Sequence, residues 1–137
     1  MTENPFAAPD PEQNRSWREF AALQRISERH SAAPPANPWL DQLGLTLEPV
    51  EAVERVVRGA AGGPAAEGAP AVDTDDLVAA LTLVPRVRAG VDELEMGLLQ
   101  LARGRGLTWQ QIAFGLGLGT PQAARQRYER LVGRAAP

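Results

Sequence analysis

The longest regular pattern of apolar residues in this chain lies between Asp73 and Gly104. Apolar side chains recur there every seven residues in two series, Leu77, Val84, Val91 and Leu98 together with Ala80, Val87, Leu94 and Leu101. This a/d spacing over four heptads predicts a long helix or a broken pair of helices. Pro85 removes an intrahelical hydrogen bond and clashes with the preceding turn, so we expect a kink or break at residues 82–85.

Two packing arrangements suit the heptad series. We expect residues 86–104 to pack within the chain, against the two helices that follow. That three-helix core would comprise Val91, Leu94, Leu98, Leu101, Ile112, Leu116, Tyr128 and Leu131. The earlier part of the series lies outside this core and is predicted to form a homodimer seam. The seam would comprise Leu77, Ala80, Leu81, Val84 and Val87, and as a dimer surface the series has Gly90 and Gly97 beside it to allow close helix approach.

Two short helices with a corner between them are predicted in residues 106–131, GLTWQQIAFGLGLGTPQAARQRYERL. Thr108 and Gln111 have the spacing of a capping box, which predicts the start of the first helix. Gly117 accepts the left-handed backbone that a tight corner requires. Thr120 can cap a second helix that has Pro121 at its first position. The inner faces would comprise Trp109, Ile112, Ala113 and Leu116 in the first helix and Ala124, Tyr128 and Leu131 in the second.

The outer face of the second predicted helix is polar and carries Gln122, Arg125, Gln126, Glu129 and Arg130. Glutamine can bond bidentately to adenine, and arginine to the O6/N7 edge of guanine. A small alanine in the first helix, a glycine in the corner and a polar second helix are typical of a helix-turn-helix. We therefore expect residues 120–132 to enter the major groove of double-stranded DNA. Phosphates would be bound by Arg103, Arg105 and Arg134 and by the helix N-termini at Thr108 and Thr120.

The stretch LARGRGLTWQQIAFGLGLGTPQAARQRYERL resembles the helix-turn-helix in the fourth region of bacterial sigma factors. It is more similar to small actinobacterial DNA-binding regulators, some labelled as regulators of a small heat-shock gene, with the pattern G-x-S-W-x-x-I-A-x-x-L-G-x-x-S-x-Q-A-A-x-x-R-Y-x-R-L. The resemblance covers residues 77–132. It implies a scaffold of Trp109, Ile112, Ala113, Leu116 and Gly117 and a DNA-facing side of Thr120, Gln122, Arg125, Gln126 and Arg130. Thr108 and Thr120-Pro121 depart from the serines of the pattern, which leaves base preference open.

Charge is distributed unevenly along the chain. Residues 103–137 hold 6 arginines and a single acidic residue, whereas residues 1–102 hold 8 arginines and 16 acidic residues. This asymmetry is typical of a chain whose basic end meets a polyanion while the rest stays acidic.

The N-terminal half is predicted to be partly disordered, with short helices. Residues 1–13 read as a disordered tail and residues 62–72 as a flexible linker. Between them, helices are expected from Ser16, which is predicted to cap the first of them, to about His30, briefly within residues 37–44, and within residues 46–59, ending near Gly59. Region 14–61 buries too few large side chains for an independent core, so we expect it to contact a protein partner, chiefly through residues 14–58. The helix-turn-helix domain occupies residues 73–137.

Several classes of function are disfavoured by composition. The chain has no cysteine and one histidine, His30, so we expect no metal site, no cofactor and no enzymatic activity. No stretch approaches the ~20 apolar residues of a membrane span, and the start has no signal-peptide pattern. We expect no membrane association and a cytoplasmic location.

These patterns predict an all-α fold, with a C-terminal helix-turn-helix domain preceded by a long, Pro-kinked heptad helix. The predicted function is sequence-specific regulation of bacterial transcription by a DNA-binding homodimer. The alternative is a protein-interaction adaptor that engages RNA polymerase or a sigma factor.

Overall fold

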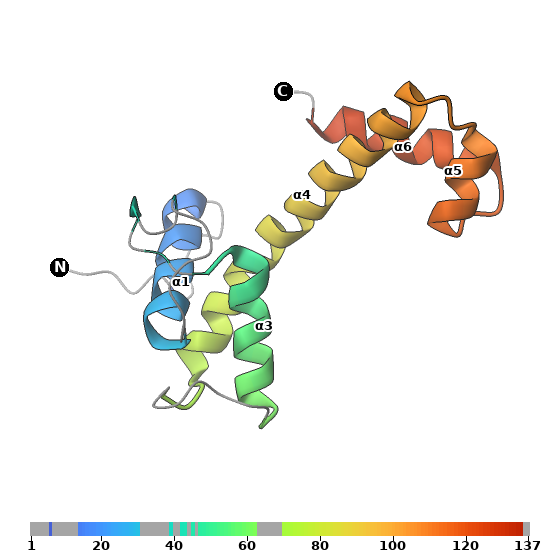
Figure 1. The fold of residues 1–137 in the computed structure, drawn as a ribbon. Helices are drawn as coiled ribbons and strands as arrows, with labels where there is room; N and C mark the ends of the chain where they lie inside the picture. The colour runs from blue at the N-terminus through green and yellow to red at the C-terminus, as the bar shows by residue number, and fades with distance from the viewer. Residues whose placement is uncertain are drawn as a thin grey trace. The chain divides into compact units, whose positions relative to one another are not determined.

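A computed structural model describes residues 6, 14–30, 39, 42, 43, 45, 47–62 and 70–135 (Figure 1). Within these residues the chain is α-helical without a strand, which confirms the predicted all-α class. The helices are α1 (Arg15–His30), α3 (Pro49–Ala60), α4 (Thr74–Gly104), α5 (Trp109–Leu116) and α6 (Pro121–Ala135). None of the described helices has the length and apolar composition needed to cross a bilayer. The chain divides into two compact units, unit 1 (Met1–Val87) and unit 2 (Arg88–Pro137).

Unit 1 packs α1, α3 and the first part of α4 around one apolar core. The buried residues are Ala22, Leu23, Ile26, Leu45, Leu47, Ala52, Val56, Ala79, Ala80 and Leu83. The N-terminal helices therefore obtain from α4 the apolar surface that they lack by themselves. Helix α1 begins at Arg15, so Ser16 lies inside the helix and is not its cap.

Parts of the predicted N-terminal organisation lie outside the described residues. These are most of the tail at 1–13, most of the short helix at 37–44 and most of the linker at 62–72. Phe6 from the tail and Val72 from the linker are described, and both pack against the core of unit 1.

A buried carboxylate connects α1 to the start of α4. The side chain of Asp76 is fully buried and accepts hydrogen bonds at 2.9 Å from Nε of Arg25 and from Nε of Arg29. Nε2 of His30 lies 2.9 Å from the other carboxylate oxygen. Asp76 and Asp73 also cap α4 reciprocally, with the Asp76 amide donating to Asp73 (2.8 Å) and the Asp73 amide donating to Asp76 (3.1 Å). One carboxylate therefore both starts α4 and holds it against α1.

These contacts keep Asp76 ionised. Burial by itself would raise the pKa of Asp76, but the hydrogen bonds from His30 and Arg29 and from the Asp73 backbone outweigh it and hold the pKa well below its usual range. No short-range pattern reveals this pairing, because 46 residues separate His30 from Asp76.

Helix α4 is continuous from Thr74 to Gly104, with Pro85 inside it. Of the two predicted forms, the unbroken helix is the one observed. Ala80, placed in the predicted dimer seam, is instead buried in the core of its own chain, because α4 must cover α1 and α3 with one face. Other members of that seam remain accessible, with Leu77 46% and Leu81 69% exposed and Val84 and Val87 half-buried.

Unit 2 packs the second part of α4 against α5 and α6. Its buried core is Leu99, Ile112, Ala113, Ala124 and Leu131, flanked by the partly buried Met96, Ala102, Trp109, Leu118 and Tyr128. The predicted core positions Ile112, Tyr128 and Leu131 are confirmed, whereas Leu116 is 38% exposed.

The heptad residues of α4 in unit 2 are not part of this core, so that prediction is wrong. The exposed residues are Val91 (56%), Leu94 (71%), Leu98 (66%) and Leu101 (61%). Helix α4 instead turns its neighbouring face, with Met96, Leu99 and Ala102, toward α5 and α6. Two acidic residues on this face bind arginines of α6, and these ion pairs help to determine which side of α4 is covered.

Candidate nucleic-acid interface

The start of α5 is held by a complete capping box. Thr108 Oγ1 accepts a hydrogen bond from the Gln111 amide (3.1 Å), and Gln111 Oε1 accepts one from the Thr108 amide (2.8 Å). This confirms the predicted cap. The reciprocal bonds define where α5 begins and therefore orient the helix relative to the end of α4.

A left-handed glycine turns the chain after α5. Gly117 has a φ of 71°, and the amide of Leu118 donates to the carbonyl of Ala113 at 2.8 Å. A Cβ added to Gly117 would meet no atom of the described part of the chain within 4 Å, so the backbone angle, and not lack of space, requires glycine there. This confirms the predicted role of Gly117. Ala113 and Ala124 are both buried in the core that α5 and α6 share, where their small side chains allow the helices to approach closely.

Helix α6 begins with the cap and the proline that the sequence predicted. Thr120 Oγ1 accepts a hydrogen bond from the Ala123 amide (3.1 Å), and Pro121 is the first residue of the helix. Because proline has no amide hydrogen, its position at the first turn costs no hydrogen bond. The cap and the proline together allow α6 to begin directly after the corner.

The outer face of α6 is exposed. Its exposed residues are Gln122, Arg125, Gln126, Glu129 and Arg130. Arg125 forms an i,i+4 ion pair with Glu129 (3.4 Å), in which both side chains remain more than 60% exposed. Within the described part of the chain, Gln122, Gln126 and Arg130 have no hydrogen bond or ion pair through their side chains. These three side chains are therefore available to an external ligand.

The other predicted phosphate ligands differ in their surroundings. Arg105 is exposed and its side chain has no partner among the described residues. Arg103 lies 4.8 Å above the ring of Trp109 and donates to the carbonyl of Leu107 (2.9 Å). Arg134 donates to Asp92 (3.1 Å). Among the described residues Arg105 therefore has no side-chain partner, whereas Arg103 and Arg134 contact residues of their own unit.

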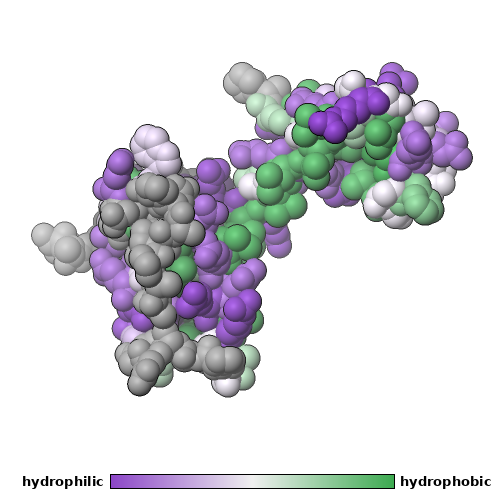
Figure 2. Space-filling view, in the orientation of Figure 1, coloured by the Kyte–Doolittle hydropathy of each residue, from purple (hydrophilic) through white to green (hydrophobic). Residues whose placement is uncertain are grey.

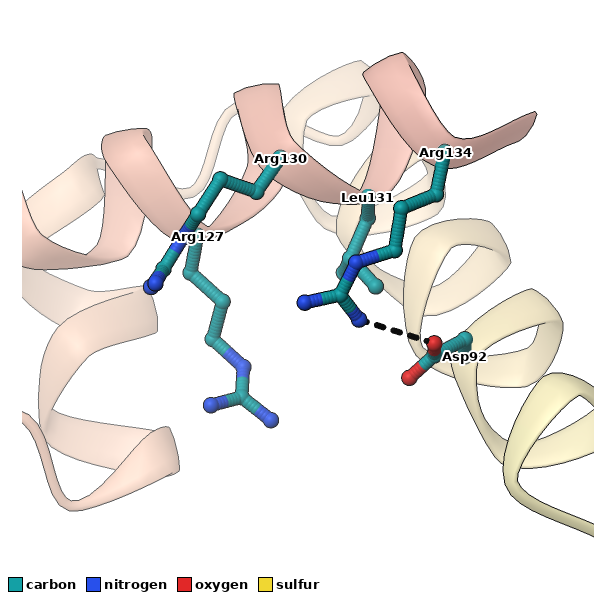
Figure 3. A pocket seen from close by; sticks show the side chains of 5 residues that line it. All are labelled: Asp92, Arg127, Arg130, Leu131 and Arg134. Carbon is teal, nitrogen blue, oxygen red and sulfur yellow. Dashed lines mark hydrogen bonds and ion pairs between the residues drawn. The ribbon is translucent and has the colours of Figure 1, made fainter. Parts of the chain in front are cut away.

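A small open pocket lies between α4 and α6. It is lined by Asp92, Arg127, Arg130, Leu131 and Arg134, and Figure 3 shows the ion pair between Arg134 and Asp92 across it. Arg127 donates to Glu95 (2.8 Å), and this hydrogen bond lowers the pKa of Glu95 and raises that of Arg127. Arg130 is the arginine of this pocket that has no described carboxylate partner.

Sequence reasoning did not find the ion pairs between α4 and α6. Arg127 and Glu95 are 32 residues apart, and Arg134 and Asp92 are 42 residues apart. Opposite charges on two helices become a signal only when the facing sides of the helices are known. Only the tertiary structure shows which sides of the helices face each other.

Comparisons of this chain with protein families, curated proteins and solved structures found no match. In the described residues, no group of histidine and acidic side chains is arranged to hold a metal ion. The functional interpretation therefore rests on the geometry of α5 and α6 and on the residues that they expose.

Proposed function

We propose that this chain is a sequence-specific, DNA-binding regulator of bacterial transcription. In this proposal α5, the corner at Gly117 and α6 form a helix-turn-helix, preceded by a long α4 that is kinked at Pro85. The observation that carries the proposal is the outer face of α6, which is capped at Thr120 and presents free glutamine and arginine side chains. The resemblance to small actinobacterial regulators supports the same interpretation and a cytoplasmic location.

In this proposal some side chains recognise base edges of the DNA and others bind its phosphates. Helix α6 enters the major groove, where Gln122 and Gln126 suit adenine and Arg125 and Arg130 suit guanine. To contact a base, Arg125 gives up its ion pair with Glu129. This loss costs little binding free energy, because exposed ion pairs contribute little. Arg105 binds a phosphate and therefore positions the protein without reading sequence.

We expect the full-length chain to bind duplex DNA with an affinity that falls as salt rises. Each neutralised phosphate releases counterions. Three phosphate contacts, one from Arg105 and two from Arg103 and Arg134 once these exchange their partners within the chain for DNA, predict a roughly 40-fold loss between about 50 and about 200 mM salt. Duplexes selected from a random pool, followed by fluorescence anisotropy at several salt concentrations, would measure this slope. Absence of binding to every selected duplex would contradict the proposal.

Arg125 and Arg105 are expected to contribute differently. Arg125→Ala should cost about 1–3 kcal/mol on the selected sequence and much less on random DNA, because it removes a base contact. Arg105→Ala should weaken binding to both DNAs alike and reduce the salt slope by about one. The two variants are matched because both residues are exposed arginines of the same unit. Equal losses on selected and random DNA for Arg125→Ala would remove it from the base-reading set.

A protein-interaction adaptor that engages RNA polymerase or a sigma factor is the second candidate. The observation that favours it is Phe114, which is 88% exposed on α5. Exposed aromatic side chains are common anchors of protein interfaces. The salt titration separates the two candidates, since an adaptor of this kind would not need to bind DNA directly.

A further inference from the structure

An exposed row of apolar residues in unit 2 follows one side of α4. We name it the α4 stripe, and it comprises Val91, Leu94, Leu98 and Leu101. Each of these side chains is between 56% and 71% exposed, and Figure 2 shows hydrophobic residues gathered along α4. Contiguous apolar surfaces of this kind usually mark sites of interaction.

The stripe has the spacing of a helix-packing surface. Its members follow one another at intervals of three, four and three residues, which is the a/d pattern that packs against another helix. The helices of unit 2 do not use it, because α5 and α6 cover the neighbouring face around Leu99. No charged residue is a member of the stripe, so a partner helix could cover it without burying an unpaired charge.

Glycines accompany the stripe at the same period. Gly90, Gly97 and Gly104 are seven residues apart, and each lies three or four residues from Leu94 or Leu101, which places them on the same side of the helix. A Cβ added to any of the three would meet no atom of the described residues within 4 Å. Glycine weakens a helix interior relative to alanine, and no contact among the described residues explains its use here. Close approach of another helix backbone would explain it.

We propose that a second copy of this chain packs its own α4 stripe against this one to form a homodimer. The stripe is self-complementary, because two helices with the same a/d spacing can interdigitate along their whole contact. Among the described helices, α4 has the longest exposed apolar row, so a second α4 matches it best in length and spacing. This seam begins at Val91, about one turn beyond Val87, where the seam expected from the sequence ended, and it does not depend on DNA binding.

Sedimentation equilibrium of the full-length chain over a range of concentrations would test this interface. The wild type should show a monomer–dimer equilibrium. Leu94→Glu combined with Leu98→Glu should raise the dimer dissociation constant by at least about a hundredfold, because four charges per dimer would enter an apolar seam. Both leucines are exposed in the single chain, so circular dichroism should show unchanged helix content.

Phe114→Glu is the matched control, since it places the same charge on an exposed apolar residue outside the stripe. It should leave the dissociation constant unchanged. Gly97→Gln provides an independent variant, which should raise the melting temperature of the monomer and weaken the dimer by about tenfold or more. The proposal is overturned by a wild type that stays monomeric at high concentration. It is also overturned if the double variant dimerises as tightly as the wild type, or if Phe114→Glu raises the dimer dissociation constant as much as the double variant does. A Gly97→Gln dimer as tight as the wild-type dimer would overturn it as well.

Discussion

Replacing Asp76 with alanine is expected to lower the free energy of unfolding of unit 1 by about 3–5 kcal/mol. The carboxylate is fully buried and accepts hydrogen bonds from Arg25 and Arg29, with His30 also within hydrogen-bond distance. Its removal leaves the partly buried Arg29 and the buried His30 without this acceptor and removes half of the cap on α4. The loss should therefore exceed that of an ordinary surface charge.

Hydrogen exchange followed by mass spectrometry would locate this effect. Amides of α1 and α3 should exchange faster in Asp76→Ala, and amides of α6 should not. Asp75→Ala is the matched control, because Asp75 occupies the same first turn of α4 but has no described hydrogen bond or ion pair. It should change stability by no more than about 0.5 kcal/mol. Equal protection in the two variants would contradict a structural role for the Asp76 cluster.

The lowered pKa of Asp76 predicts how the free energy of unfolding changes with pH. The pKa of Asp76 is lower in the folded chain than the usual value of about 3.9, so the folded state binds fewer protons than the unfolded state near that pH. Its stabilising contribution is therefore present above about pH 4 and is lost as the pH falls below it. Asp76→Ala should lack this part of the acid dependence. An unchanged acid profile in that variant would assign the dependence to other carboxylates.

Leu99→Ala and Leu98→Ala, although adjacent in sequence, should differ strongly. Leu99 is 4% exposed in the core of unit 2, so its truncation should cost about 2–5 kcal/mol of unfolding free energy. Leu98 is 66% exposed, and in a dilute, monomeric sample its truncation should cost less than about 1 kcal/mol.

Urea denaturation at low protein concentration would compare the two variants. Helix content at 222 nm suits this measurement, because the helices of unit 2 contribute to it. Comparable losses in both variants, or a larger loss for Leu98→Ala, would mean that the a/d face of α4 is part of the folded core.

Local structure around α5 and α6 was predictable because its determinants are close in sequence. Thr108 and Gln111 are three residues apart, Thr120 is followed at once by Pro121, and Gly117 alone provides the required φ. The polar outer face of α6 follows from the helical period. The proposed DNA contacts rest largely on these local features, so the candidate interface could be located from the sequence.

Packing of α4 was not predictable in the same way. Its periodicity identified a helix, but an a/d row can face the chain's own core or a second copy with the same pattern. Leu99 was overlooked because it lies outside the heptad series. The distant partners of Asp76, Glu95 and Asp92 left no local signal either.

The sequence by itself therefore determined the helical class, the ends of α5 and α6, the glycine corner between them and the basic character of the C-terminal region. Caps, turn residues and periodicity act over a few residues, so they can be seen in a single chain. Only the tertiary structure decided which face of α4 is buried. It also decided that Ala80 belongs to the core of unit 1 and that Asp76 binds α1. Burial and ion pairing depend on which surfaces meet, and that is settled by the mutual fit of distant segments.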